Sequence, residues 1–512
     1  MFFQATRQDR AMPSPQARVA AFAPTLAFLM ACVVILGTAA LRSASDIPAS
    51  PPNDDIWQHA AALLALMENL ADPANPFVAT GETSRHFHPL WVAFAAVGRA
   101  LDLSVWTLLA GASVLSMALL GLGIFLFART YFASSAWAPL VLLLCMSMVW
   151  LVQPHHTGFH AFHTLLYGAA YPATMMIGAG LILWALTIRA LDAARPRRAA
   201  LWPLLLGGLM VTTHQLGAVI ALIGAGAFVL VWPGARIMRR GLVGAGLLAG
   251  VALSFAWPYH SPVGLMLRPG NSSWEGGFDV HDPFVLVVLL TPTALGIFGL
   301  ARPRARPLVL ALLAYLAVYL YGLDGPQVAG RFLMPVILVL HVGLADLLLG
   351  LVAWRAVRVP RTVALLAVSG VVVAWLGYTL PRFEARNLLP VLPGEQTHHD
   401  AARALTADIP DDEEVAAREV LAWPIVGTGQ RVLSVPWPEP GIHDLAARQA
   451  VTRALFDPAL SQADRVALAR AHGVRTLLSN AEPPGDVVTR TLADQAISVR
   501  RLGPYVRVDL YE

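Results

Sequence analysis

The chain has 512 residues, of which 57% are hydrophobic and only 13% are charged, with a formal net charge of +4. Its mean hydropathy is +0.61. Soluble domains carry about twice this share of charged residues, so the composition excludes a soluble protein and indicates an integral membrane protein. The two cysteines, Cys32 and Cys145, fall inside apolar runs, which predicts packing roles instead of a disulfide or a metal pair.

Eleven apolar runs follow a polar N-terminal segment that carries Arg7, Arg10 and Arg18. A helix needs about 20 mostly apolar residues to cross a bilayer. The spans are predicted at 19–41, 104–128, 134–153, 168–190, 200–214, 215–233, 242–258, 283–300, 307–321, 333–353 and 363–380. The break at 212–215 leaves open whether its two neighbours are separate spans or a bent hairpin near the membrane surface.

A polar stretch of about 45 residues separates the first two spans, which is long for a simple connection and therefore suggests a function. Within it, Ile56 to Leu70 has helical periodicity. A second apolar piece, Pro89 to Leu101, is too short to cross a bilayer. Both are predicted to be helices that lie in the membrane interface.

Arginines predict the orientation of the spans. The connectors 195–198, 236–240, 302–306 and 355–361 are basic and alternate with connectors that are not. Arginine-rich connectors stay on the cytoplasmic side, which places the N-terminus there too. Eleven spans then put the first long loop, about 43–103, and the C-terminus on the periplasmic side of a bacterial inner (plasma) membrane. Anionic lipid accounts for the inner arginines, so they do not indicate nucleic acid.

Charged residues become frequent from about residue 382, and the long apolar runs stop. We therefore divide the chain into a membrane module, 1–381, and a periplasmic domain, 382–512. Strands are predicted at 432–435, 474–478, 497–501 and 505–510, and helices at 443–456 and 461–472. Their alternation predicts a small α/β domain.

The first candidates for chemistry are Asp54 and Asp55, just before the first interfacial segment. A carboxylate there can take a proton from a hydroxyl nucleophile, and adjacent acids can also bind a divalent ion such as Mg or Mn. Adjacent acids are common on solvated loops, so a structural role stays open. The same outer face is predicted to hold further polar residues around a substrate cavity: His59, Arg85, His86, His88, Trp274 and Glu275.

A cytoplasmic N-terminus, an acidic pair in a long first outer loop and a soluble outer domain resemble the GT-C glycosyltransferases. These include protein O-mannosyltransferases, lipid A aminoarabinose transferases, mycobacterial arabinofuranosyltransferases and oligosaccharyltransferases. The resemblance covers the membrane region as architecture and identifies no subfamily. It implies that Asp54 and Asp55 are the catalytic acids and that 56–70 and 89–101 are the two juxtamembrane helices of the fold.

The resemblance also implies an inverting transfer from a polyprenyl-phosphate sugar to a glycan, lipid or protein. The run Gly330-Arg331-Phe332 is similar to an Arg-Phe/Tyr motif near the lipid-phosphate site of such enzymes. Cationic groups would hold the departing phosphate, with Arg331 as first candidate and Arg268, His155 and His156 as weaker ones. The alternatives are an arginine that anchors a helix end and interfacial histidines that cap a helix.

No cofactor or metal site is expected, although a divalent cation remains possible. Three other functions stay open: a transporter or flippase for lipid-linked glycan, a non-catalytic envelope scaffold, and a glycan ligase or polymerase. A transporter would favour charged residues deep in several spans and repeat symmetry between halves, and neither is evident. His341 and Asp346 lie within a span, but we expect them to lie away from the proposed site.

Overall fold

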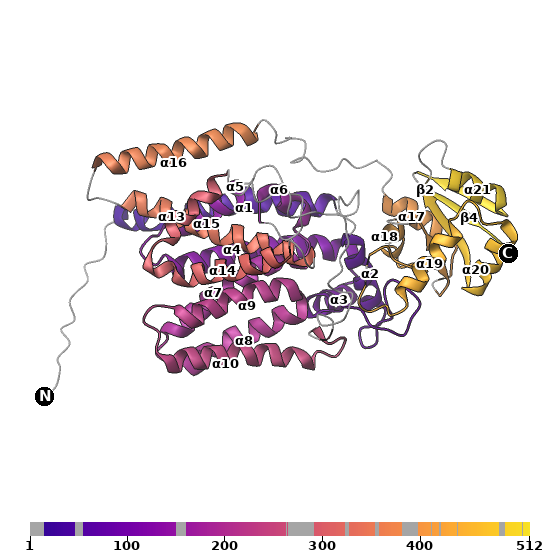
Figure 1. Cartoon of the computed structure of the whole chain (residues 1–512), viewed down its shortest axis with the longest axis horizontal. Coiled ribbons are helices and arrows are strands. Elements are labelled where there is room, and N and C mark those ends of the chain that lie inside the picture. The colour runs from indigo at the N-terminus through magenta and orange to yellow at the C-terminus, as the bar shows by residue number, and fades with distance from the viewer. Residues whose placement is uncertain are drawn as a thin grey trace.

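The computed structural model describes residues 15–46, 55–149, 160–262, 264, 291–322, 327–353, 358–380, 398–410, 412–418, 421–437, 439–480, 487–503 and 505–512. Long helices form a bundle, and a small domain of helices and strands lies at one end of it (Figure 1). Two shorter helices, α2 (Asp55–Glu68) and α3 (Pro89–Leu101), lie between the bundle and this domain. The chain is therefore a helical polytopic membrane protein with a C-terminal α/β part.

Each of the eleven predicted spans overlaps a helix, although 283–300 is described only from residue 291. Six helices in the described part of the chain are long and apolar enough to cross a membrane. The bundle consists of α1 (Pro15–Asp46), α4 (Val105–Tyr131), α5 (Ala138–Met148), α6 (Phe162–Gly168), α7 (Pro172–Asp192), α8 (Pro196–Thr213), α9 (Gln215–Val231), α10 (Ile237–Leu253), α13 (Gly296–Leu300), α14 (Arg306–Tyr321), α15 (Leu333–Ala353) and α16 (Arg358–Thr379). Short 3-10 turns are η1 (Ser254–Ala256), η2 (Pro292–Leu295), η3 (Pro303–Ala305) and η4 (Gln327–Phe332).

Close approach of α4 and α7 depends on glycine. A Cβ added at Gly178 would lie 2.6 Å from backbone atoms of Leu119 and Leu120. One added at Gly123 would lie 2.4 Å from the carbonyl oxygen of Gly178. Helices in lipid associate through close packing instead of a hydrophobic driving force, so small residues at the crossing stabilise the pair.

The break predicted at 212–215 is a sharp turn between two helices. His214 alone separates α8 from α9, in an extended conformation with φ −157° and ψ 100°. Its Nδ1 accepts a hydrogen bond of 3.0 Å from the backbone N–H of Gly217 and so caps α9.

Both predicted juxtamembrane helices form. Pro89 begins α3 at a position where its missing N–H costs nothing. His88 caps the same end by accepting from the backbone N–H of Trp91 at 3.4 Å. The helix stops at Asp102, which adopts the left-handed conformation with φ 51°.

A four-stranded sheet with the order β1-β2-β4-β3 organises the C-terminal domain. Its strands are β1 (Glu414–Ala417), β2 (Val474–Asn480), β3 (Ser498–Leu502) and β4 (Tyr505–Asp509). The pair β1–β2 is parallel, and the other two pairs are antiparallel. Its helices are α17 (His398–Thr406), α18 (Ala422–Val426), α19 (Leu445–Leu455), α20 (Gln462–Ala471) and α21 (Val487–Gln495).

Three of the four predicted strands are confirmed, but the strand at 432–435 is wrong. That segment makes only an isolated bridge between Val415 and Val432. The backbone N–H of Val432 instead donates to the carbonyl oxygen of Phe77, in the first loop, at 2.8 Å. The backbone N–H of Val432 is therefore used in the contact with the first loop and is not available to a neighbouring strand. The predicted boundary at 381–382 lies outside the described residues.

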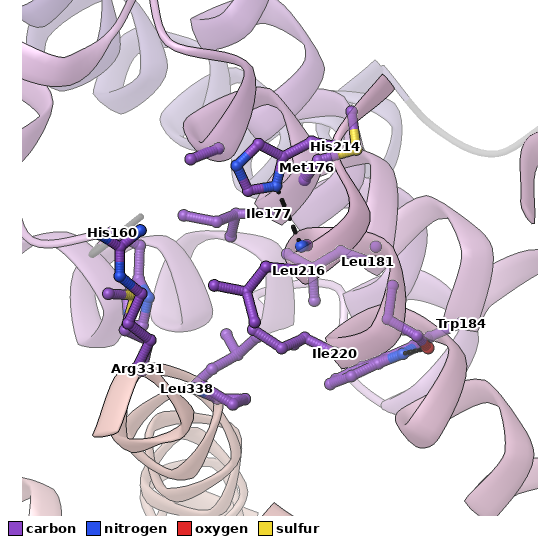
Figure 2. A pocket seen from close by; sticks show the side chains of 16 residues that line it. His160, Met176, Ile177, Leu181, Trp184, His214, Leu216, Ile220, Arg331 and Leu338 are labelled. Atoms are coloured by element: carbon purple, nitrogen blue, oxygen red, sulfur yellow. Dashed lines mark hydrogen bonds between the residues drawn. The ribbon is translucent and has the colours of Figure 1, made fainter. Parts of the chain in front are cut away.

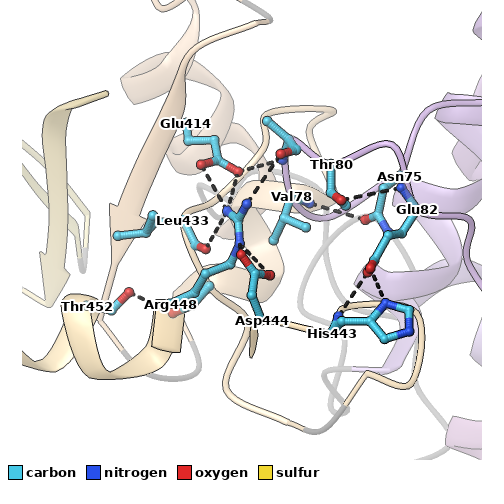
Figure 3. Close-up of polar contacts among 12 residues, drawn as sticks. Asn75, Val78, Thr80, Glu82, Glu414, Leu433, His443, Asp444, Arg448 and Thr452 are labelled. Atoms are coloured by element: carbon cyan, nitrogen blue, oxygen red, sulfur yellow. Dashed lines mark hydrogen bonds and ion pairs between the residues drawn. The ribbon is translucent and has the colours of Figure 1, made fainter. Parts of the chain in front are cut away.

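Hydrogen bonds, supported by ion pairs within the C-terminal domain, join this domain to the first loop (Figure 3). The guanidinium of Arg448, on α19, donates to Glu414 at 3.0 Å and to Asp444 at 2.9 Å. Glu414 also accepts a 2.5 Å hydrogen bond from the backbone N–H of Ala79. Nearby, Glu82 accepts from the backbone N–H of His443 at 2.9 Å. These contacts hold the domain against the loop that carries the candidate acids.

Candidate functional site

Asp55 is the first residue of α2. Burial raises the pKa of its carboxyl, and the charges of Arg331, Arg85 and His86 oppose that rise. The side chain of Gln58 donates to the Asp55 carboxylate at 3.4 Å. Residues far apart in the sequence therefore meet around this carboxylate.

Arg331 lies in η4, directly before α15, and is half-buried. It lines a pocket together with His160 and His214 (Figure 2). The charge of Arg331 acts on the carboxyl of Asp55, so the predicted acid and the predicted phosphate ligand lie within electrostatic range of each other, although 276 positions (331 − 55) separate them.

The pocket beneath Arg331 is mostly apolar and lies between α7, α9 and α15 (Figure 2). Apart from its three polar residues, it is lined by Ala173, Met176, Ile177, Gly180, Leu181, Trp184, Leu216, Gly217, Ile220, Ala221, Met334, Pro335 and Leu338. Such a combination of apolar walls with a few polar groups suits an amphipathic ligand whose charged end lies at Arg331.

Three histidines of the site have their tautomers set by neighbouring N–H groups. The indole N–H of Trp91 donates to Nδ1 of His59 at 3.2 Å. The backbone N–H of Trp91 donates to Nδ1 of His88 at 3.4 Å, and His214 accepts in the same way from Gly217. An accepting nitrogen carries no proton, so the neutral ring carries it on Nε2. Each of these rings therefore offers Nε2 as a hydrogen-bond donor.

Burial lowers the pKa of His59 and of His88 well below the ordinary value, and interactions with neighbouring histidines lower both further. Both rings are therefore neutral near pH 7. The site combines neutral donors with the charged groups of Asp55 and Arg331.

Glu439, from the C-terminal domain, is a site residue that sequence reasoning missed. Its carboxylate lies 3.2 Å from Nε of Arg85 and 3.7 Å from Nε2 of His86. Burial acts to raise the pKa of Glu439, but Arg85 and His86 hold it below its usual range. A single glutamate in a proline-rich run gives no sequence signal, because only the folded chain brings it to the first loop.

His341 was expected away from the site, and this expectation is wrong. Its Nδ1 lies 3.0 Å from Nε2 of His160, which lines the pocket with Arg331. Its Nε2 lies 3.1 Å from the hydroxyl of Thr293. The apolar run predicts that His341 lies in a span, but its contact with His160 arises only in the folded chain. Asp346, five residues further along α15, instead pairs with Arg302 at 3.0 Å.

Six of the predicted site residues lie outside the described part of the chain: Asp54, His155, His156, Arg268, Trp274 and Glu275. Their roles stay predictions. Among the residues that the structure describes, no group of three or more His, Cys, Asp or Glu side chains is arranged to hold a metal ion.

No family model matches the sequence, and no curated protein sequence matches it. Solved structures do match the fold. ArnT from Cupriavidus metallidurans is 12% identical, with a TM-score of 0.58 over 96% of this chain and 98% of that chain. The arabinofuranosyltransferase AftD from Mycobacteria is 16% identical, with a TM-score of 0.58 over 94% of this chain. This chain spans 40% of the length of AftD.

An oligosaccharyltransferase from Archaeoglobus fulgidus, tethered with an acceptor peptide, is 12% identical. Its TM-score is 0.51 over 88% of this chain and 69% of that chain. The structural matches establish a shared fold. Because the sequence identities are this low, the activity has to be argued from the site. The chain has the helical membrane fold of the GT-C glycosyltransferases.

Proposed function

We propose that the protein is an inverting glycosyltransferase that moves a sugar from a polyprenyl-phosphate donor to an acceptor at the periplasmic face of a bacterial inner membrane. The observation that supports this proposal is that Arg331, which lines an apolar pocket with His160 and His214, also acts electrostatically on the carboxyl of Asp55. A reaction between a lipid-linked donor and a polar acceptor needs charged groups for the reacting atoms and an apolar pocket for the lipid at one place.

The donor would bind with its phosphate at Arg331 and the first part of its lipid in the apolar pocket between α7, α9 and α15. An arginine holds a phosphate through two parallel N–H donors. The Nε2–H of His214 lies in the same pocket and would donate to a phosphate oxygen without adding charge.

Asp55 would accept the proton of an acceptor hydroxyl, whose oxygen then attacks the anomeric carbon from the face opposite the phosphate. The bond between the anomeric carbon and the phosphate oxygen breaks, and the lipid phosphate leaves with its electron pair. No acid is needed for such a leaving group, so one carboxylate suffices for catalysis. Arg331 would stabilise the negative charge that grows on the departing phosphate. Asp54 remains the other candidate base.

The experiment that tests this proposal profiles glycans and glycolipids in membranes from cells that carry Asp54→Ala, Asp55→Ala or Arg331→Ala. Each variant is first checked for normal protein levels. We expect one acid variant to lose a single sugar modification and to accumulate the unmodified acceptor. If neither acid variant changes any glycan while deletion of the whole protein does, the glycosyltransferase proposal is wrong. A transporter, a scaffold or a glycan ligase or polymerase would then take its place.

A further inference from the structure

A second group of polar side chains lies beside Arg85, separate from the residues that line the apolar pocket. It consists of His86 and His88 from the first loop, His260 after α10, and Glu439 from the C-terminal domain. Glu439 lies 3.7 Å from His86. His260 interacts electrostatically with both His86 and Glu439, and His88 interacts with both His86 and His260. Three distant parts of the sequence therefore bring these four side chains near one another.

Buried polar atoms in this group lack hydrogen-bond partners within the part of the chain that the structure describes. They are Nε2 of His86, Nε2 of His88, both ring nitrogens of His260, and Oε1 of Glu439. All four side chains are more than nine-tenths buried. A buried polar atom without a partner costs about 1 to 3 kcal/mol, and most such atoms in proteins are paired. A concentration of them at one place indicates a site for water or for a polar ligand.

The chemistry of these atoms identifies the ligand class. His88 presents Nε2–H as a donor, because its Nδ1 accepts from Trp91. The carboxylate oxygen of Glu439 can only accept, and the two nitrogens of a neutral His260 provide one donor and one acceptor. A hydroxyl group both donates and accepts, so neighbouring hydroxyls match this mixture. A phosphate or a carboxylate would be repelled by Glu439 and would leave its oxygen unpaired.

We infer that His86, His88, His260 and Glu439 form a subsite that binds the hydroxyl groups of a glycan acceptor. This inference rests on the proposed function, since it names the acceptor class for the same reaction. An aromatic ring lies next to the group, since Phe77 packs edge-on against His86 with ring centroids 5.4 Å apart. Glu439 makes the C-terminal domain part of the acceptor site.

The Glu439 carboxylate is held in place by its own loop and by the first loop. The backbone N–H of Ile442 donates to the Glu439 carbonyl oxygen at 2.9 Å, which closes a turn. Within that turn, Gly441 lies so close to the first loop that a Cβ would approach the carbonyl oxygen of Thr83 to 2.3 Å. The indole N–H of Trp257 donates to the carbonyl oxygen of Phe87 at 2.8 Å and ties the segment before His260 to the same loop.

The test measures binding of two probes to the full-length protein in lipid nanodiscs free of sugar headgroups. A panel of methyl glycosides is examined by saturation-transfer-difference NMR, and polyprenyl phosphate is examined by its effect on thermal stability. The variants are Glu439→Gln, His260→Asn and Arg331→Gln. The control is Glu82→Gln, because Glu82 joins the first loop to His443 of the C-terminal domain but is not part of the subsite.

We expect at least one glycoside to bind to the wild type and to Glu82→Gln with equal affinity. Its binding should weaken about tenfold or more in Glu439→Gln, as expected for loss of a hydrogen bond to a charged group. In His260→Asn it should weaken about twofold to tenfold, as expected for loss of a hydrogen bond to a neutral ring. Arg331→Gln should keep glycoside binding and lose the effect of polyprenyl phosphate.

Equal glycoside binding to all variants would overturn the subsite. So would an absence of glycoside binding in a protein that still binds polyprenyl phosphate, and the proposed donor site would then stand without it. A protein that binds neither probe would contradict both the subsite and the proposed function.

Discussion

The indole N–H of Trp91 donates to Nδ1 of His59 over 3.2 Å, which joins the two juxtamembrane helices and fixes the ring with its proton on Nε2. Protonation of Nδ1 would break this bond and place a charge among buried groups. Accordingly, burial and the neighbouring histidines lower the pKa of His59 well below 6.5. Since His59 stays neutral near pH 7, it does not determine how the site responds to pH in that range.

The first prediction is that transferase activity falls with decreasing pH through the ionisation of Asp55. A base must be unprotonated to act, and burial raises the pKa of Asp55 above its ordinary value. Protonation therefore begins at a higher pH than for an exposed aspartate, whose pKa is about 3.9. The measurement is kcat/KM between pH 4.5 and 8.5. A profile that stays flat across this range would contradict the assignment.

A second variant distinguishes the effect of Asp55 ionisation on the pH profile from the effect of histidine protonation. Trp91→Phe removes the indole donor to His59, so the His59 ring becomes easier to protonate. We expect this variant to lose activity at a higher pH than the wild type. An unchanged profile in Trp91→Phe would mean that the bond does not hold His59 neutral.

The second prediction concerns donor binding by Arg331. Arg331→Gln removes the positive charge beside Asp55 and should weaken binding of polyprenyl phosphate about tenfold to a hundredfold, since hydrogen bonds to charged groups contribute about 1.5 to 3 kcal/mol. Arg331→Lys should recover part of the affinity, because lysine keeps the charge but cannot bind with two parallel donors. The measurement is a titration of polyprenyl phosphate in nanodiscs.

Arg99→Gln is the matched control, because Arg99 lies at the end of α3 and donates only to the carbonyl oxygen of Glu68 among the bonds that the structure describes. It should bind polyprenyl phosphate as the wild type does. Equal loss in both variants would show a general effect of surface charge instead of a phosphate site.

Much of this arrangement follows from sequence patterns, and the part that does not has a physical reason. The length of each apolar run predicts the spans and the helix at 89–101, because a helix makes its backbone hydrogen bonds within its own segment. Arg331 is also recognisable as a charge at the end of a span, and Asp55 as one of two adjacent acids in a long first outer loop. Glu439 and His341 are not, because their roles arise from contacts with His86 and His160, far away in the sequence.

The third prediction is that Arg448→Ala loosens the C-terminal domain. Arg448 joins α19 to Glu414, and Glu414 also accepts from Ala79 in the first loop. Removing one partner of a largely buried ion pair costs about 3 kcal/mol, because the remaining carboxylate stays desolvated. We expect faster cleavage by a protease between the bundle and the domain, together with lower activity if Glu439 belongs to the site.

Arg453→Ala provides the comparison on the same helix, since Arg453 is exposed. Its cleavage rate should equal that of the wild type. If Arg448→Ala is as resistant to protease as Arg453→Ala, the ion pair with Glu414 does not hold the domain in place.

The fourth prediction uses two glycines in the membrane bundle that differ only in their surroundings. Gly178→Ala places a methyl group 2.6 Å from backbone atoms of α4, which cannot move aside by a side-chain rotation. Overpacking of this kind costs about 1 to 3 kcal/mol, so the melting temperature in nanodiscs should fall. Gly226→Ala, on α9, meets nothing within 4 Å and gains helix propensity of about 0.5 to 1 kcal/mol, so its melting temperature should stay the same or rise. The opposite signs of the two changes are the decisive result, because a general intolerance of alanine would lower both melting temperatures. Equal or higher stability of Gly178→Ala would show that α4 and α7 do not cross as closely as described.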